Sequence, residues 1–158
     1  MKRVAALVLL ASTTFATVSL GIAAEGTDSF DGIWVLQLAR SSERANFSET
    51  VTISHKNGVE TYQADVMRDG KRSGMRYEAS SDGKPYPYFD IVTGEKRGTT
   101  RLTQTKPWLE ISVFVPDSGS GGPPPTIEHW LSNDGRSFIS VLKDKQGDVR
   151  DVLVWEKK

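Results

Sequence analysis

The sequence predicts an all-β protein, an antiparallel up-and-down barrel of about eight to ten strands. Short runs of β-branched and aromatic residues recur along the chain, and turn dipeptides such as Asn57-Gly58 and Asp69-Gly70 separate them. No segment has a convincing helical pattern. A series of hairpins leaves two unpaired edges unless its first and last strands meet, and closing a barrel removes both edges.

Nine segments have the composition of strands and end at residues that tolerate positive φ, including Asp82-Gly83, Asp134-Gly135 and Gly147-Asp148. The predicted strands are 33–38, 50–54, 60–67, 73–79, 99–105, 109–115, 127–131, 138–142 and 149–155. The first and last contain the apolar runs Ile33-Trp34-Val35-Leu36 and Val152-Leu153-Val154-Trp155. We therefore expect these two strands to pair and close the barrel.

Alternation within the strands indicates which side chains are buried. Tyr62, Ala64 and Val66 share one face of their strand. In the strand at 109–115, one face carries Leu109, Ile111, Val113 and Val115, and the other carries Glu110 and Ser112. Each strand is thus predicted to have one buried and one wet face.

Two segments interrupt the strands. Residues 39–48 are polar and form either a loop or a single helical turn; the triplet Asn46-Phe47-Ser48 is a glycosylation acceptor only in a host that modifies it. Residues 117–125 are rich in Gly, Ser and Pro and form a long connection. This connection is either a mobile flap over an open barrel end or an ordinary surface loop, and we favour the surface loop.

The N-terminus has the order of a secretory signal peptide. Lys2 and Arg3 precede an apolar run, and small residues follow at Gly21-Ile22-Ala23-Ala24. We predict that residues 1–24 are removed, leaving 25–158 as one domain that is periplasmic or extracellular. An uncleaved anchor is the alternative, but serine and threonine dilute the apolar run. After cleavage we expect no stable membrane insertion.

Composition excludes several classes of function. The chain has 20 basic and 20 acidic residues, and removal of Lys2 and Arg3 would leave a net charge of minus two, so nucleic acid is not an expected partner. The absence of cysteine excludes disulfides, thiol catalysis and a lipid-modified cysteine. Basic residues gather at 68–76 and 96–101; these groups either meet at one barrel mouth to receive an anionic head group or are scattered turn charges, which we favour.

No catalytic residue, metal ligand or cofactor is predicted. His55 precedes a turn and is expected to be solvated, while His129 lies within a strand and has no Gly-x-Ser-x-Gly motif to accompany it. Two distant histidines without cysteine fall short of the usual zinc set. A haem held by His129 alone is a weaker alternative than a packed histidine. A glycosidase pair at Asp28 and Asp31 would require a cleft between them.

Aromatic residues on the predicted strands either fill a small barrel or line a cavity. Core filling is the default interpretation. If a cavity exists, we expect Trp34, Tyr62, Tyr77 and Trp130 to form the ligand-binding wall.

Four motifs in order carry a resemblance. They are Gly32-Ile33-Trp34-Val35-Leu36 with Ala39-Arg40-Ser41, Tyr77-Glu78-Ala79 with Asp82-Gly83-Lys84-Pro85-Tyr86-Pro87, Leu131-Ser132-Asn133-Asp134-Gly135-Arg136, and Val152-Leu153-Val154-Trp155-Glu156-Lys157. Together they resemble small exported bacterial proteins of lipocalin-like type, although Arg40 replaces a lysine and the loop at 117–125 is longer. The resemblance implies a closed antiparallel barrel, and most members of this group have no assigned function.

These observations favour an exported, non-catalytic protein that binds a small apolar or amphipathic ligand inside the barrel. The alternative is an interaction or inhibitor module that presents residues 117–125 and Pro85-Tyr86-Pro87-Tyr88 to another exported protein. A hydrolase that uses His129 is the third and least favoured interpretation.

Overall fold

A computed structural model describes residues 29–42, 47–118 and 125–158. The predicted signal peptide at 1–24, Asn46 of the glycosylation triplet and most of the connection at 117–125 lie outside the described residues. Within the described part, no helix is long and apolar enough to cross a membrane.

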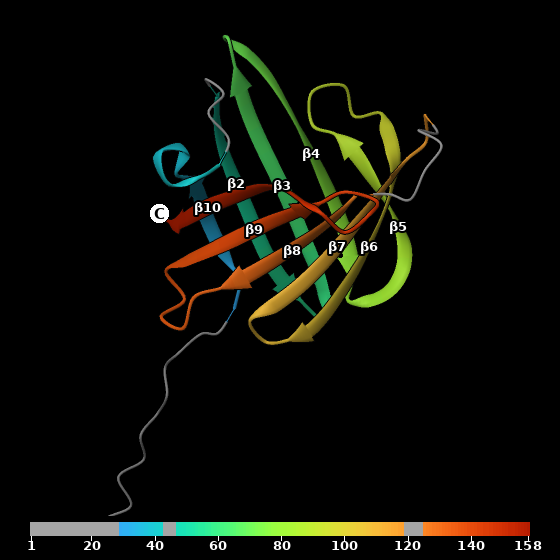
Figure 1. The fold of residues 1–158 in the computed structure, drawn as a ribbon. Coiled ribbons are helices and arrows are strands. Elements are labelled where there is room, and N and C mark those ends of the chain that lie inside the picture. The colour runs from blue at the N-terminus through green and yellow to red at the C-terminus, as the bar shows by residue number, and fades with distance from the viewer. Residues whose placement is uncertain (1–28, 43–46, 119–124) are drawn as a thin grey trace, which may run out of the picture.

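The described residues form ten antiparallel strands that close into a single barrel (Figure 1). The elements are β1 (Gly32–Leu36), the 3₁₀ helix η1 (Leu38–Arg40), β2 (Phe47–Lys56), β3 (Val59–Arg68), β4 (Lys71–Ser80), β5 (Asp82–Asp90), β6 (Lys96–Lys106), β7 (Leu109–Pro116), β8 (Thr126–Leu131), β9 (Ser137–Lys143) and β10 (Val149–Lys157). Each strand pairs with its neighbour in the sequence, and β1 also pairs with β10. The predicted up-and-down barrel is confirmed.

Closure occurs where we expected it, between the two apolar terminal strands. Trp34 lies opposite Lys157, and Leu36 lies opposite Trp155, while the other edge of β1 pairs with β2. The backbone N–H of Gln37 extends the β1–β10 contact by donating to the Val154 carbonyl over 2.8 Å. Pairing on both edges of β1 leaves no open edge between the first and last strands.

Two predicted hairpin turns have the expected backbone. Asn57 and Gly58 have φ values of 54° and 76°, and Asp69 and Gly70 have 50° and 73°. Two consecutive residues at positive φ are typical of the type I′ turn, whose twist matches that of the flanking strands. These turns set the register of β2, β3 and β4.

Strand β5 is the strand that sequence reasoning missed. Pro85 and Pro87 lack the N–H that a strand interior needs, so composition did not indicate a strand. Both prolines pair with β6, opposite Arg101 and Thr99, whereas only Tyr88–Asp90 pair with β4. Tyr86 and Tyr88 are half-buried against the core. They therefore do not form the exposed loop surface that the interaction-module alternative expected.

The polar segment after β1 is a 3₁₀ turn followed by a strand. Leu38–Arg40 form η1, so the helical-turn alternative is correct for that part, and Phe47 and Ser48 already belong to β2.

One end of the barrel interior is filled with aromatic side chains. The Phe138 ring contacts Trp34 at a centroid distance of 4.8 Å, Trp155 at 5.5 Å and Phe30 at 5.8 Å. Trp34 Nε1 donates to the Phe30 carbonyl over 2.7 Å, which holds the segment before β1 against this cluster. The default interpretation of core filling is correct for Trp34. Polar groups adjoin this packing, since the His129 ring lies 5.7 Å from that of Phe138.

Candidate functional site

Three of the four side chains predicted to form a ligand-binding wall point into the barrel. Trp34 belongs to the aromatic cluster, and the Tyr62 and Tyr77 rings stack on each other at 4.8 Å with an interplanar angle of 4°. Trp130 is 39 % exposed, because His129 and Leu131 take the inward positions of β8. It packs on the outside against Trp108 at 5.6 Å. The inner-wall position expected of Trp130 is therefore wrong.

His129 lies in a buried network rather than a catalytic one. Its Nδ1 is 2.9 Å from Ser140 Oγ, and that hydroxyl also accepts the Trp155 indole N–H over 2.9 Å. Burial lowers the His129 pKa to about 4, so the ring is neutral at pH 7. Ser140 is 2 % exposed, and among the described residues no carboxylate hydrogen-bonds to His129. Such a serine is out of reach of a substrate, so this geometry does not favour the hydrolase alternative.

A polar group faces the interior next to this network, because Glu110 of β7 lies opposite His129 of β8 in the ladder. Glu110 and Ser112 are the buried positions of β7, while Leu109, Ile111 and Val113 point outward and are only half-buried. The predicted facing of this strand is therefore inverted. Because Glu60 is an inward residue of β3, the two carboxyl groups meet inside the barrel.

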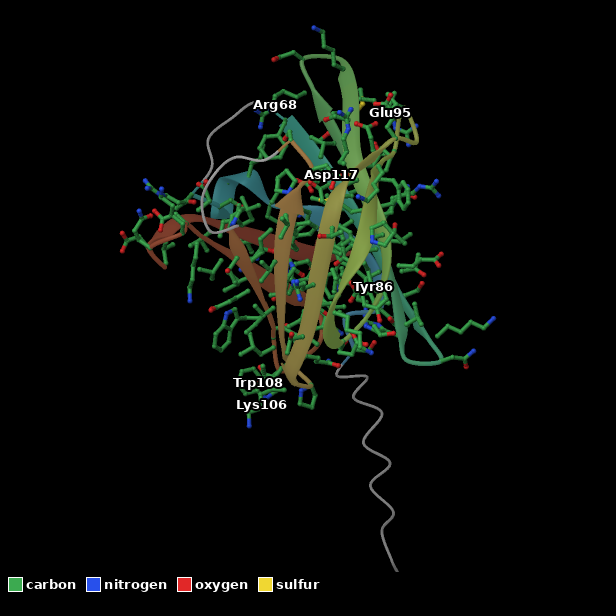
Figure 2. All side chains as sticks on the ribbon, turned by 90° about the vertical axis from the view of Figure 1, so that its right-hand side faces the viewer. Arg68, Tyr86, Glu95, Lys106, Trp108 and Asp117 are labelled. Atoms are coloured by element: carbon green, nitrogen blue, oxygen red, sulfur yellow. The ribbon has the colours of Figure 1, made fainter. Side chains whose placement is uncertain are left out.

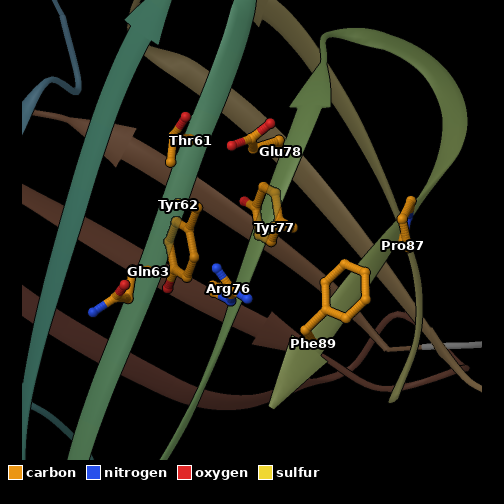
Figure 3. A pocket seen from close by; sticks show the side chains of 8 residues that line it. All are labelled: Thr61, Tyr62, Gln63, Arg76, Tyr77, Glu78, Pro87 and Phe89. Atoms are coloured by element: carbon orange, nitrogen blue, oxygen red, sulfur yellow. The ribbon is translucent and has the colours of Figure 1, made fainter. Parts of the chain in front are cut away.

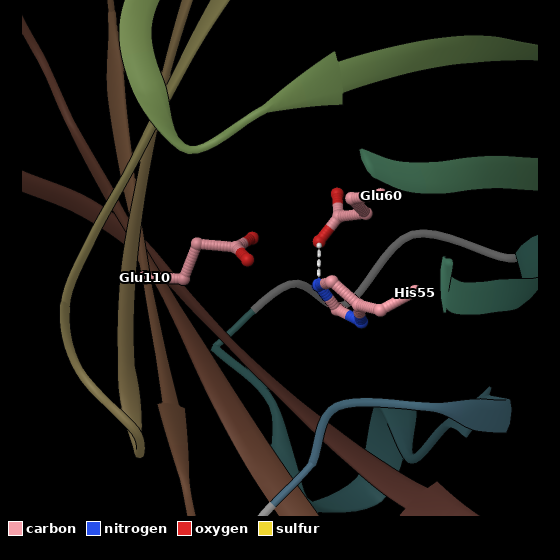
Figure 4. A group of neighbouring side chains, drawn as sticks. All are labelled: His55, Glu60 and Glu110. Carbon is pink, nitrogen blue, oxygen red and sulfur yellow. Dashed lines mark ion pairs between the residues drawn. The ribbon is translucent and has the colours of Figure 1, made fainter. Parts of the chain in front are cut away.

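His55, near the end of β2, completes this cluster. His55 Nε2 lies 3.3 Å from Glu60 Oε2, and one ligand atom each from His55, Glu60 and Glu110 lie within 4.8 Å of one another (Figure 4). His55 Nδ1 is bound to Asp31 Oδ1 at 2.6 Å. The solvated position expected of His55 is correct only in part, because its side chain is 28 % exposed but both ring nitrogens face carboxylates.

The ionisation of the cluster follows from burial and from these contacts. The Glu60 carboxylate beside Nε2 is the largest cause that raises the His55 pKa, to about 9, with burial opposing it and Asp31 adding to it. Burial raises the pKa of Glu60, but its contacts with His55, Glu110 and Tyr77 outweigh burial and leave that pKa below its ordinary value. Burial and the negative charge of Glu60 hold the Glu110 pKa well above its usual range.

Five buried side-chain atoms of the barrel interior form no hydrogen bond of normal geometry within the part of the chain that the structure describes, although two of them, His55 Nε2 and Glu60 Oε2, form an ion pair at 3.3 Å. We call the residues that carry them the polar inner wall: His55 (Nε2), Glu60 (Oε2), Thr100 (Oγ1), Glu110 (Oε2) and Ser112 (Oγ). Buried polar atoms are nearly always paired, and an unpaired one costs about 1–3 kcal/mol. The polar inner wall is therefore suited to a bound polar group.

A pocket beside the two stacked tyrosines has a volume of about 350 Å³ (Figure 3). Its lining comes from β3, β4 and β5 and includes the outward-facing residues Thr61, Gln63, Arg76 and Glu78, together with Pro87, Phe89 and the two stacked tyrosines. Arg76 lies over the Phe89 ring at 5.9 Å. Tyr77, which lines this pocket, also donates to Glu60 of the polar inner wall over 2.8 Å, so the two regions adjoin.

The two basic groups are spread along the barrel. Arg68 and the turn at Glu95 lie at one end, and Lys106 and Trp108 lie at the other (Figure 2), whereas Arg101 donates to the Gly83 carbonyl near the start of β5 over 3.2 Å. Acidic neighbours accompany these bases: Arg72 pairs with Asp65, Lys96 with Asp117 and Arg97 with Asp90. This pairing favours the interpretation that the basic residues are ordinary charges of the turns. It does not favour a site for an anionic head group.

Sequence reasoning missed the polar inner wall because it assumed that the apolar face of each strand points inward. The alternation of side chains along β3 could have indicated it. Glu60 shares its face of β3 with Tyr62 and Ala64, which were predicted to be buried, and so Glu60 was a predictable interior carboxylate.

Comparison with known proteins gives no guide to function. No known family model matches the sequence, and no curated protein sequence matches it. The resemblance to small exported lipocalin-like proteins therefore stays a prediction, although the closed barrel agrees with the fold that it implies.

Proposed function

We propose that this protein is an exported, non-catalytic binding protein that holds a small amphipathic molecule inside the barrel. The observation that carries the proposal is the polar inner wall, in which the buried Thr100 Oγ1 and Ser112 Oγ have neither a hydrogen bond nor an ion pair among the described residues. Export is supported by the signal-like pattern of residues 1–24.

The chemistry of the interior supports an amphipathic ligand over a purely apolar one. Thr100 and Ser112 offer hydroxyls, and Glu60 offers a carboxylate oxygen that accepts hydrogen bonds. Nearby, the stacked Tyr62 and Tyr77 rings and Phe114, 6.0 Å from Tyr77, present apolar surface. A molecule with hydroxyl or amine groups at one end and an apolar body would satisfy both surfaces.

Bound ligand is the direct test. The mature protein, purified from its own host, should carry a co-purifying small molecule in native mass spectrometry, and solvent extraction should release it. The double variant Thr100→Val, Ser112→Ala removes two hydroxyls of the polar inner wall with little change in volume, so it should retain much less of that molecule. Thr103→Val is the matched control, because Thr103 lies on the same strand and is exposed.

Two results would contradict the proposal. One is wild-type protein that is repeatedly empty or holds only water. The other is equal retention of the small molecule by the wild type, the double variant and the Thr103→Val control, which would place the bound molecule away from the polar inner wall.

A further inference from the structure

We propose that His55, Glu60 and Glu110 form a binding site for a divalent transition-metal ion, with zinc as the representative metal. This inference goes beyond the proposed organic ligand: the three residues belong to the polar inner wall, but Thr100 and Ser112 take no part in the metal site, so the two proposals can be tested separately. Imidazole nitrogen and carboxylate oxygen are both common ligands of zinc in proteins.

The ligand atoms are already close to coordination geometry. His55 Nε2 and Glu60 Oε2 lie 3.3 Å apart. Two ligands at roughly 2.0–2.1 Å from a tetrahedral zinc ion are roughly 3.3 Å from each other, so this pair needs almost no movement. All three ligand atoms lie within 4.8 Å of one another, and rotation of the flexible Glu110 side chain can bring its oxygen nearer (Figure 4).

The residues around the ligands are arranged as outer partners of a metal site. A metal-bound histidine usually donates its other ring N–H to a carboxylate or a carbonyl, which fixes the tautomer and the ring orientation. His55 Nδ1 contacts Asp31 Oδ1 at 2.6 Å in this way and leaves Nε2 toward the cluster. The Tyr77 hydroxyl donates to Glu60 Oε1 over 2.8 Å, so Glu60 Oε2 remains for the ion.

The burial of the two carboxyl groups is an independent reason to expect a bound cation. Glu60 is 1 % exposed and Glu110 is 2 % exposed; among the described residues Glu110 forms no ion pair, and Glu60 has only His55, 3.3 Å away. Two buried carboxyl groups in contact are unfavourable unless a cation or a proton lies between them. A divalent ion would satisfy one oxygen of each carboxyl group and His55 Nε2 at once.

The ligand atoms are buried, but the site lies beside partly exposed side chains. The His55 side chain is 28 % exposed and the Asp31 side chain is 47 % exposed, whereas the carboxyl groups lie deeper. Three protein ligands on a tetrahedral ion leave one position for water or for a group of a bound molecule.

Metal titration tests the site. Mature protein, freed of metal with a chelator, is titrated with zinc chloride by calorimetry, and the stoichiometry is read by native mass spectrometry. We expect one ion per chain with a dissociation constant in the micromolar range or below. Glu110→Gln and Glu60→Gln should each weaken binding at least tenfold, and Asp31→Asn should weaken it by about 10–100-fold through the orientation of His55.

Two controls separate this site from nonspecific binding and from the organic ligand. Glu78→Gln removes an exposed carboxylate of β4 and should leave zinc affinity unchanged. The Thr100→Val, Ser112→Ala variant should also keep its zinc affinity, even where it loses the organic molecule. Failure of one proposal is thereby distinguishable from failure of the other.

A structural readout covers the case in which a ligand variant does not fold. Crystals of the wild type soaked in zinc should show an anomalous peak bonded to His55 Nε2. Absence of that peak, binding no tighter than millimolar, or equal zinc affinity in the wild type and a folded Glu110→Gln variant would overturn the proposal.

Discussion

Ser140 Oγ lies 2.9 Å from His129 Nδ1 and at the same distance from Trp155 Nε1, so a single hydroxyl connects β8, β9 and β10 inside the barrel. Because the hydroxyl accepts the indole N–H, its own proton is free to bond to the neutral histidine. This relationship explains why His129 and Ser140, which by residue type suggest catalysis, have a structural role here.

Ser140→Ala should lower the free energy of unfolding by about 2 kcal/mol, because it leaves both the Trp155 N–H and His129 Nδ1 without a partner in the core. Urea unfolding at pH 7 measures the change. Ser48→Ala, at an exposed position of β2, should change stability by less than about 0.5 kcal/mol. Equal effects of the two substitutions would contradict a structural role for this hydroxyl.

The two histidines should titrate at opposite ends of the pH range in metal-free protein. Burial lowers the pKa of His129 to about 4, whereas the contact with Glu60 raises the pKa of His55 to about 9. Ring-proton NMR shifts measured from pH 3.5 to 10 would resolve both. Two transitions near pH 6.5 would show that neither environment is as described.

The depressed pKa of His129 makes the folded protein less stable at low pH. The unfolded chain binds a proton near pH 6.5 and the folded protein only near pH 4, so stability from this group is present above pH 6.5 and is lost as the pH falls toward 4.

Glu49 should contribute to stability with the opposite pH dependence from His129, and Glu49→Gln should remove that contribution. Burial raises the Glu49 pKa from 4.5 to about 7, with Arg68 opposing the shift. Stability from this group is therefore full below pH 4.5 and is lost as the pH rises through about 7, where the buried carboxyl ionises. Relative to the wild type, the Gln variant should gain about 3 kcal/mol at most between pH 4.5 and pH 8. Parallel stability curves for the two proteins would refute this prediction.

The fold could be predicted from local signals, whereas the interior chemistry could not. Turn dipeptides and the apolar runs around Trp34 and Val154 act within a few residues and indicated both the hairpins and the closure. The facing of β7 depends on what lies across the barrel, because Glu110 points inward toward Glu60 and His55 from strands about 50 residues earlier. Alternation alone gives the period of a strand but not which face is buried.

The same limit explains Trp130. Its position in an alternating strand was predicted correctly, but the inward positions of β8 belong to His129, which bonds to Ser140 across the β8–β9 ladder, and to Leu131. The partner strand therefore decides the facing, and that partner is not visible in local composition.

Gly74→Ala should be among the most destabilising single substitutions in the barrel. Gly74 has φ of 144°, and an added Cβ would lie 2.0 Å from the Ala64 carbonyl oxygen on the neighbouring strand β3. Both the backbone strain and the collision with a backbone atom require β3 and β4 to separate locally, so we expect a loss of about 3 kcal/mol or more. Gly147→Ala is the control, because Gly147 also has positive φ, 87°, but an added Cβ there meets nothing within 4 Å. Thermal unfolding of both variants should show the larger loss for Gly74→Ala. A smaller loss than at Gly147 would mean that the two strands are not in the close contact described.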